Sequence, residues 1–148
     1  MPRIKMELLP FYPFNTLIPI RITDINYGGH VGNDAILALL HEARVQFLQS
    51  MGYQEMDMNG TGLIMSNVVI EFKKELFYGN HIKVSMAAGE FTKASFELFY
   101  KIEKEWEEKN ELVALAKTGM VCFDYTNRKI ARLPEEVRLK LQMPGKKD

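Results

Sequence analysis

The sequence predicts a single α+β domain in which an antiparallel sheet encloses one long helix. A short β-rich run is followed by one amphipathic helix pattern and then by four segments in which apolar and polar residues alternate. A lone helix ahead of a run of strands does not build a parallel α/β repeat, whereas strands joined by short turns favour antiparallel pairing. At 148 residues the chain suits one domain with a substantial core. We therefore expect five strands curled round a central helix.

The composition excludes several functional classes. Lysine plus arginine and aspartate plus glutamate each number 19, so no global field attracts nucleic acid or a membrane surface. No apolar run reaches the roughly 20 residues that span a bilayer, and the first residues lack the pattern of a secretion signal, which favours a cytoplasmic protein. The single cysteine, Cys122, excludes an internal disulfide and a multi-cysteine metal site, and its apolar neighbours predict a buried, unreactive thiol.

The N-terminal region divides into an arm and a first strand. Residues 1–15 combine three prolines with three aromatic residues, and we expect an irregular arm that lies against the body of the domain. Residues 16–23 predict a strand. Pro19 has no backbone N–H to donate, so part of this strand is expected at a sheet edge or a bulge.

Residues 33–51 predict one long amphipathic helix. Asn33 is expected to cap its N-terminus, Asp34 complements the positive end of the helix dipole, and Gly52 is expected to end it. Apolar residues recur along one face at spacings of three and four. They are Ile36, Leu40, Ala43, Phe47 and Met51, with Leu37, Leu39 and Leu48 widening the stripe. So wide a band indicates a helix that the rest of the fold largely encloses.

After the helix, period-two alternation predicts four half-buried strands. Their ranges are 64–75, 82–88, 94–103 and 112–125. In the first of them one side is expected to carry Ile64, Val68, Ile70 and Phe72, and the other Val69 and Glu71. The charged segment 104–111 predicts a solvated hairpin tip, and Pro134 is expected to begin a short terminal helix.

The candidate site is the segment 22–33, Ile-Thr-Asp-Ile-Asn-Tyr-Gly-Gly-His-Val-Gly-Asn. It joins the first strand to the helix. Glycines let the backbone approach a ligand closely, and the first N–H groups of a helix point at whatever binds there. Asp24, Asn26 and His30 add polar side chains to the same corner. With only three histidines and no three-ligand spacing, we expect no metal site.

This region resembles the hotdog-fold thioesterases of the 4-hydroxybenzoyl-CoA thioesterase type. Residues 21–44, R-I-T-D-I-N-Y-G-G-H-V-G-N-D-A-I-L-A-L-L-H-E-A-R, follow that family's pattern Arg-x-x-Asp-x-Asp-x-x-Gly-His-Val-Asn-Asn and the helix after it. Residues 77–80 and 124–138 resemble later parts of the family. The resemblance covers residues 16–141 and implies one hotdog domain there, between the arm at 1–15 and a tail at 142–148.

The resemblance also implies roles for individual residues. Asn26 falls on the family's second aspartate, the nucleophile or general base, and an amide can perform neither task, although it can orient a water or a carbonyl. His30 falls on the family's histidine, and Gly32 stands where the family has asparagine. The implied substrate-binding residues are Asp24, Tyr27, Gly28, Gly29, Val31 and Asn33.

A carboxylate for hydrolysis then has to come from elsewhere, and Asp34 and Glu42 are the main candidates. Glu42 matches a helix glutamate that has a catalytic role in the plant acyl-carrier-protein thioesterases, which this segment also resembles. It lies about 140° from the centre of the apolar stripe, so a solvated or dimer-facing glutamate is the alternative. The other candidates also have structural alternatives. Asp34 could serve only to complement the helix dipole, and Asp24 could hold a turn. His30 could hold the loop through a hydrogen bond to the backbone.

Three functions are compatible with these residues. The leading hypothesis is hydrolysis of an acyl-CoA or acyl-carrier-protein thioester in a homodimer or homotetramer, at a site between subunits, with CoA or phosphopantetheine present only as part of the substrate. Asn26 favours a non-catalytic domain that binds acyl thioesters. An enoyl-thioester hydratase ranks lower, because the interval from Asp24 to His30 is one residue too long for that family's loop and the loop proline is absent.

Overall fold

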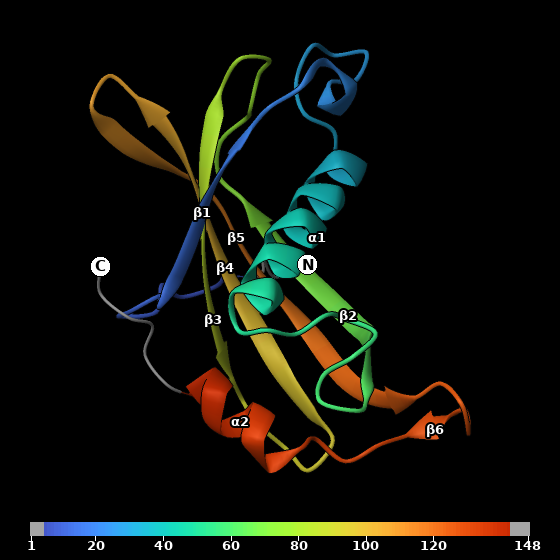
Figure 1. The fold of residues 1–148 in the computed structure, drawn as a ribbon. Coiled ribbons are helices and arrows are strands. Elements are labelled where there is room, and N and C mark those ends of the chain that lie inside the picture. The colour runs from blue at the N-terminus through green and yellow to red at the C-terminus, as the bar shows by residue number, and fades with distance from the viewer. Residues whose placement is uncertain (1–4, 143–148) are drawn as a thin grey trace.

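The computed structural model describes residues 5–142 (Figure 1). Its elements, in chain order, are β1 (Phe14–Pro19), the 3₁₀ turn η1 (Ile22–Asp24), α1 (Asn33–Ser50), β2 (Gly62–Phe72), β3 (His81–Gly89), β4 (Ser95–Trp106), β5 (Lys109–Asp124), β6 (Lys129–Ile130) and α2 (Glu135–Gln142). All strand pairs are antiparallel, in the order β1-β3-β4-β5-β2, with β6 paired to β5. The predicted α+β class is confirmed, with six strands where five were expected, because two residues after the turn at 125–128 return to β5.

Helix α1 lies across one face of the sheet (Figure 1) and its ends are set by backbone geometry. The expected N-cap is wrong by one residue: Gly32 is the cap and Asn33 is the first helical residue, with no side-chain capping bond. The C-terminal stop is as predicted, since Gly52 has a φ of 85°, its N–H donates to the Gln49 carbonyl at 3.0 Å, and Tyr53 N donates to the Leu48 carbonyl at 2.9 Å.

The core lies between α1 and the sheet. Ile36, Leu40 and Ala43 are buried against strand residues such as Leu98 and Met120. The helix stripe is narrower than predicted on one flank, because Leu37 is 42% exposed. Cys122 is fully buried as expected, and burial raises the pKa of its thiol to about 11.

Strand β2 departs from the predicted alternation. A bulge between Met65 and Asn67 inserts one residue, so Ile64, opposite Val121, faces the other side from Val68, opposite the buried Thr118. At its end Phe72 is 40% exposed while Glu71 is buried. Phe72 faces the helix side, but no described element covers it at the sheet edge.

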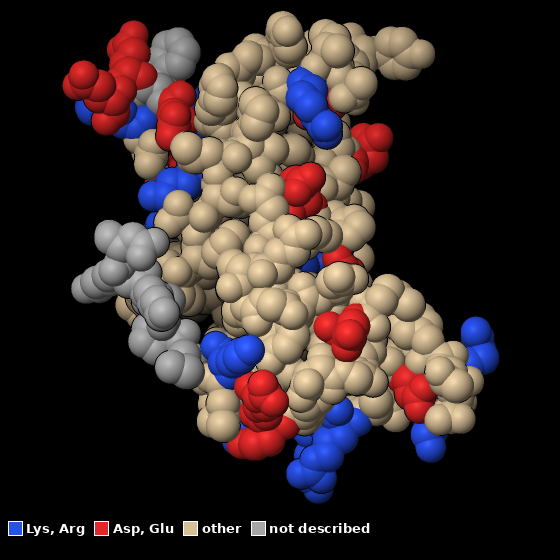
Figure 2. Space-filling model, in the orientation of Figure 1, with Lys and Arg blue, Asp and Glu red and all other residues tan. Residues whose placement is uncertain are grey.

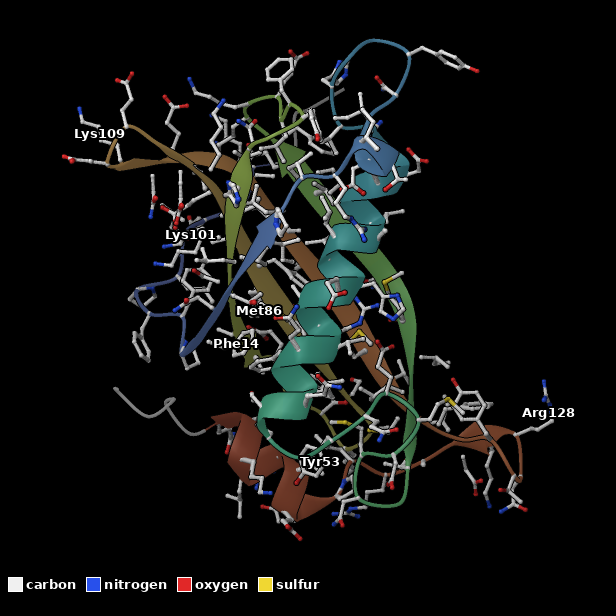
Figure 3. All side chains as sticks on the ribbon, turned by 45° about the horizontal axis from the view of Figure 1, so that its top comes forward. Phe14, Tyr53, Met86, Lys101, Lys109 and Arg128 are labelled. Atoms are coloured by element: carbon white, nitrogen blue, oxygen red, sulfur yellow. The ribbon has the colours of Figure 1, made fainter. Side chains whose placement is uncertain are left out.

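The N-terminal arm explains why Glu71 is buried. The backbone N–H of Met6 donates to Glu71 Oε1 at 3.0 Å, and Lys101 Nζ lies 4.9 Å from the centre of the Tyr12 ring. The described part of the arm therefore lies against the sheet face opposite α1, near Lys101 (Figure 3). The first strand covers residues 14–19 instead of the predicted 16–23, because pairing with β3 begins at Phe14 and the chain leaves β1 after Pro19 to enter η1.

The molecular surface carries both charge signs. Figure 2 shows lysine, arginine, aspartate and glutamate intermixed around α2 and at the β4–β5 hairpin, with mostly uncharged side chains between them. Among the described residues, no helix is long and apolar enough to cross a membrane. The tail predicted at 142–148 lies, apart from Gln142, outside the described residues.

Candidate active site

The segment between η1 and α1 is a closed backbone loop. Asn26 N–H donates to the His30 carbonyl at 2.9 Å, and Gly29 N–H donates to the Asn26 carbonyl at 3.1 Å. Gly29 has a φ of 80°, a conformation that favours glycine. Asn26 Oδ1 accepts the Gly28 N–H at 2.9 Å. The loop thus already uses the amide oxygen of Asn26 and leaves its Nδ2 as a donor.

Two contacts fix this loop to the domain. The Val31 N–H donates to the Leu76 carbonyl at 2.8 Å, which attaches the loop to the β2–β3 connection. Asp24 is 6% exposed and its Oδ2 accepts the Arg21 N–H at 2.9 Å, so this carboxylate holds a turn, as the structural alternative for Asp24 proposed. No signal in the sequence pointed to Leu76.

Asp34 reaches the loop from the first turn of α1. A methyl group built onto Gly32 would lie 2.8 Å from Asp34 Oδ1 and 3.4 Å from Asn26 Nδ2, so both side chains lie close to this buried glycine. A hollow of about 300 Å³ includes both, together with Asp24 and Tyr27. The two departures from the family pattern, Asn26 and Gly32, therefore both lie beside one carboxylate.

A second hollow of about 380 Å³ lies on the other side of the loop. It is lined by His30, Val31 and Asn33, by Ile36, Leu76 and Val113, and by the end of β2 from Phe72 to Glu75. A Cβ on Gly28 would lie 3.0 Å from His30 Cε1, so Gly28 leaves room for the imidazole against the loop. Among the described residues the His30 ring has no hydrogen-bond partner, so the backbone bond proposed for it is absent.

Glu42 does not join these residues. It lies in a third hollow, of about 220 Å³, together with Arg21 and residues of β1, and its Oε2 accepts a hydrogen bond from Gln46 Nε2 at 2.9 Å. Within one chain, therefore, the loop is accompanied by Asp34 and not by Glu42.

A buried polar network under α1 was missed by the sequence analysis. Arg44, which is 6% exposed, donates to the Tyr100 hydroxyl at 3.2 Å, and Tyr100 bonds to Thr118 Oγ1 at 2.8 Å. Arg44 Nε also lies 3.4 Å from Glu55 Oε1, and His41 Nε2 lies 2.9 Å from the same oxygen. Burial raises the pKa of Tyr100, an effect that the adjacent Arg44 charge opposes. The sequence signal that could have revealed this network is Arg44, a charged residue on the buried side of the helix.

The described residues contain no group of three or more histidine, cysteine, aspartate or glutamate side chains arranged to hold a metal ion. The chemistry available at the loop is therefore that of an amide, a carboxylate, an imidazole and the free N–H groups at the start of a helix.

Comparison with known proteins identifies the family. A 1,4-dihydroxy-2-naphthoyl-CoA hydrolase from Microcystis aeruginosa is 30% identical over 129 residues, which cover 85% of this chain and 89% of the relative. Among solved structures, a 1,4-dihydroxy-2-naphthoyl-CoA thioesterase from Synechocystis superposes with a TM-score of 0.77 at 23% identity, covering 86% of this chain and 94% of the other. A DHNA-CoA thioesterase from Staphylococcus aureus superposes with a TM-score of 0.76 at 22% identity, covering 86% and 89%.

These structures have the same hotdog fold. The model of the thioesterase-like superfamily matches residues 20–141, which begin directly after β1 and include the whole Gly-His loop, α1, strands β2 to β6 and nearly all of α2. The chain therefore belongs to the thioesterase-like superfamily.

Proposed function

We propose that this protein hydrolyses an acyl-CoA thioester at the loop that precedes α1. The observation that carries the proposal is that Asp34 and Asn26 line one hollow beside Gly32, at the N-terminus of an 18-residue helix. A carboxylate, an amide donor and unpaired backbone N–H groups then surround one hollow. These are the groups that thioester hydrolysis needs.

In the proposed reaction Asp34 is the general base. Its carboxylate takes a proton from a water molecule, whose oxygen attacks the thioester carbonyl carbon. Asn26 Nδ2 orients that water or the carbonyl, and the first N–H groups of α1 stabilise the oxyanion. The carbon–sulfur bond then breaks, and the leaving thiolate takes the proton that Asp34 accepted from the water. The products are a free acid and the thiol of CoA.

The edge of β2 supports a homodimer. Strand β2 is the last strand of the sheet order, with no described strand on its outer side, and it contains neither proline nor lysine to discourage pairing. Exposed apolar side chains, Met65 and Phe72, lie beside that edge on the helix side of the sheet. Two copies joined there by a two-fold axis, with both helices on the same face, pair their β2 strands antiparallel. We propose this dimer as the minimal assembly.

The relatives suggest the class of acyl group. The curated relative at 30% identity is named for a hydroxylated naphthoyl-CoA, so an aromatic acyl-CoA is the first substrate to test. An acyl-carrier protein is the alternative thiol carrier.

A second function is favoured by one observation. Asn26 Oδ1 already accepts the Gly28 N–H, which suits a rigid binding loop as well as a catalytic one. In that case the domain binds acyl thioesters without hydrolysing them.

The test is release of CoA, measured with a thiol reagent, across short, long and aromatic acyl-CoAs. The wild type is compared with Asp34→Asn, Glu42→Gln and Asn26→Asp. We expect turnover by the wild type, its loss in Asp34→Asn and its retention in Glu42→Gln. Loss in Glu42→Gln with retention in Asp34→Asn would instead make Glu42 the base. A silent wild type that Asn26→Asp activates would support the binding function.

A further inference from the structure

A row of residues crosses the face of the sheet that lies opposite α1. Strand pairing places one residue from each of five strands in register, from β1 at one edge of the sheet to β2 at the other. These residues, here called the outer row, are Asn15, Ser85, Lys101, Leu115 and Glu71. Ser85, Leu115 and Glu71 are each at most 8% exposed, although α1 lies on the other face (Figure 1). A different segment of the chain therefore covers this row.

The N-terminal arm is that segment. It leads into β1 at Phe14, beside the outer row. Lys101 Nζ, in the middle of the row, lies 4.9 Å from the centre of the Tyr12 ring, and the Met6 N–H donates to Glu71 Oε1 at 3.0 Å at the far edge. Five strands at the usual spacing span about 19 Å, and the chain from Met6 to Phe14 can extend to about 27 Å. The arm is therefore long enough to cross the whole sheet.

Glu71 connects the arm to the hollow that His30 lines, here called the His30 hollow. Residues 72–75, which follow Glu71 directly, form one wall of this hollow. Glu71 Oε1 accepts the Met6 N–H, and Glu71 Oε2 lies 3.6 Å from Lys73 Nζ. One carboxylate therefore contacts the arm through one oxygen and the wall of the hollow through the other.

Beyond Phe72 the wall is attached to β5 through one backbone carbonyl. The N–H groups of Lys73 and Lys74 both donate to the Val113 carbonyl, at 2.8 and 3.1 Å. Strand β2 is the last in the sheet order, so no described strand of the chain supports its other side. A contact at Glu71 is therefore well placed to determine where this wall lies.

We propose that the N-terminal arm is a strap that positions the wall of the His30 hollow, with Glu71 as the positioning residue. While the Met6 N–H is bonded to Glu71, the end of β2 stays beside β5. Without that bond, residues 72–75 separate from β5 more often and the hollow loses its shape. The arm precedes residue 20, where the match to the thioesterase-like superfamily begins, so the strap is an addition to the matched domain.

The proposed function indicates what the His30 hollow binds. Ile36, Leu76 and Val113 give the hollow an apolar lining beside the Gly-His loop, which suits an apolar part of the thioester. This step rests on the proposed function, whereas the effect of the arm on the wall can be measured without any ligand.

The first experiment measures hydrogen–deuterium exchange at the amides of Lys73 and Lys74 in the full chain. Met6→Pro removes the N–H that Glu71 accepts and changes no residue of the sheet. It should speed exchange at these two amides about fivefold, the effect of about one lost hydrogen bond. Amides in the middle of α1, such as that of Leu40, should exchange at the wild-type rate.

The matched control is Leu8→Pro. Leu8 is 55% exposed, and its N–H has no hydrogen-bond partner among the described residues. This variant also places a proline in the arm, but it should leave exchange at Lys73 and Lys74 unchanged. The proposal is overturned if Met6→Pro leaves exchange unchanged or if Leu8→Pro speeds it equally. It is also overturned if Met6→Pro speeds exchange in α1 to the same extent, since that indicates a general loss of stability.

A double variant tests whether the arm acts through Glu71. Glu71→Ala removes the acceptor of the Met6 N–H, so it should speed exchange at least as much as Met6→Pro. Adding Met6→Pro to Glu71→Ala should then cause no further change, because both substitutions break the same contact. A further increase of similar size would show that the arm acts through another residue and would overturn the role of Glu71.

The second experiment measures KM and kcat on an aromatic acyl-CoA. Met6→Pro should raise KM about fivefold and leave kcat within about twofold of the wild type, because the wall belongs to the His30 hollow whereas Asp34 lines a different one. Leu8→Pro should change neither value. Faster exchange with an unchanged KM would overturn the role of the wall in binding substrate. If the wild type has no turnover, the proposed function fails, and exchange at Lys73 and Lys74 still decides whether the arm positions the wall.

Discussion

The two ends of α1 differ in the contacts that hold them. The loop before the helix is held by hydrogen bonds between neighbours in sequence, such as Asn26 to His30, and its polar side chains Asn26 and Asp34 are exposed. The second half of the helix instead buries Arg44, which contacts Tyr100 across 56 residues of sequence. The comparison shows that exposed polar groups held by local hydrogen bonds lie at the first end, whereas buried long-range contacts stabilise the fold at the second.

The largest effect on stability is expected at the buried end. Arg44→Met removes one partner of a buried ion pair and should lower the free energy of unfolding by about 3 kcal/mol, measured by urea denaturation. The control is Arg138→Met, which breaks an exposed pair with Glu135 and should leave the free energy of unfolding nearly unchanged. Equal losses in the two variants would show that the Arg44 network is not a principal support of the fold.

The next effect concerns catalysis at the exposed end. Asp34→Asn should lower kcat on an aromatic acyl-CoA by about 100-fold, the usual contribution of a general base. The same change should alter the free energy of unfolding by less than about 0.5 kcal/mol, because the side chain is exposed. Steady-state kinetics measure kcat, and urea denaturation of the same preparation measures the free energy of unfolding. A large loss of stability would make Asp34 a structural residue.

A smaller effect is expected from the backbone of the loop. Gly29→Ala places a side chain at a φ of 80° with no atom within 4 Å of the new Cβ, so the cost of about 1 kcal/mol is conformational. Gly62→Ala is the contrasting variant, since its Cβ would lie 2.5 Å from Tyr125 Cε2 and its cost is steric. The loss of stability in Gly29→Ala and in Gly62→Ala is measured by thermal unfolding. No change in Gly29→Ala would mean that the loop relaxes to another conformation.

The smallest effect is a pH dependence of the buried core. The folded protein holds the Cys122 proton more tightly than the unfolded chain, since burial raises the thiol pKa from 9.0 to about 11. The stabilising contribution is complete below pH 9 and is lost as the pH rises towards 11. The free energy of unfolding should therefore fall more steeply between pH 9 and 11 in the wild type than in Cys122→Ala. Parallel curves would show that this thiol does not titrate with unfolding.

Local pattern predicted much of this molecule because the underlying forces act between near neighbours. The apolar stripe of α1 follows from 3.6 residues per turn, and Gly52 ends the helix because glycine readily adopts the conformation required there. The alternation in β3 and β4 follows from a two-residue period with one face buried. Asn26 was singled out differently, because its position matches an aspartate in the family that the motif resembles.

The features that escaped the sequence depend on distant partners. A bulge after Met65 shifts the faces of β2, and Glu71 is buried because Met6, 65 residues away, covers it. The predicted Asn33 cap was wrong by one residue, because the helix already begins at Asn33 and its N-cap is Gly32, which has no side chain to form a capping bond.

The sequence by itself determined the α+β class, the long helix, the glycine-rich loop and the candidate residues within it, because periodicity and turn chemistry are local properties. Only the tertiary structure decided which candidates meet. It placed Asp34 and Asn26 in one hollow close to Gly32, and it left Glu42 in another hollow with residues of β1. The physical reason is that side-chain proximity and burial depend on how the helix packs on the sheet and where the loops close, and these are properties of the whole fold.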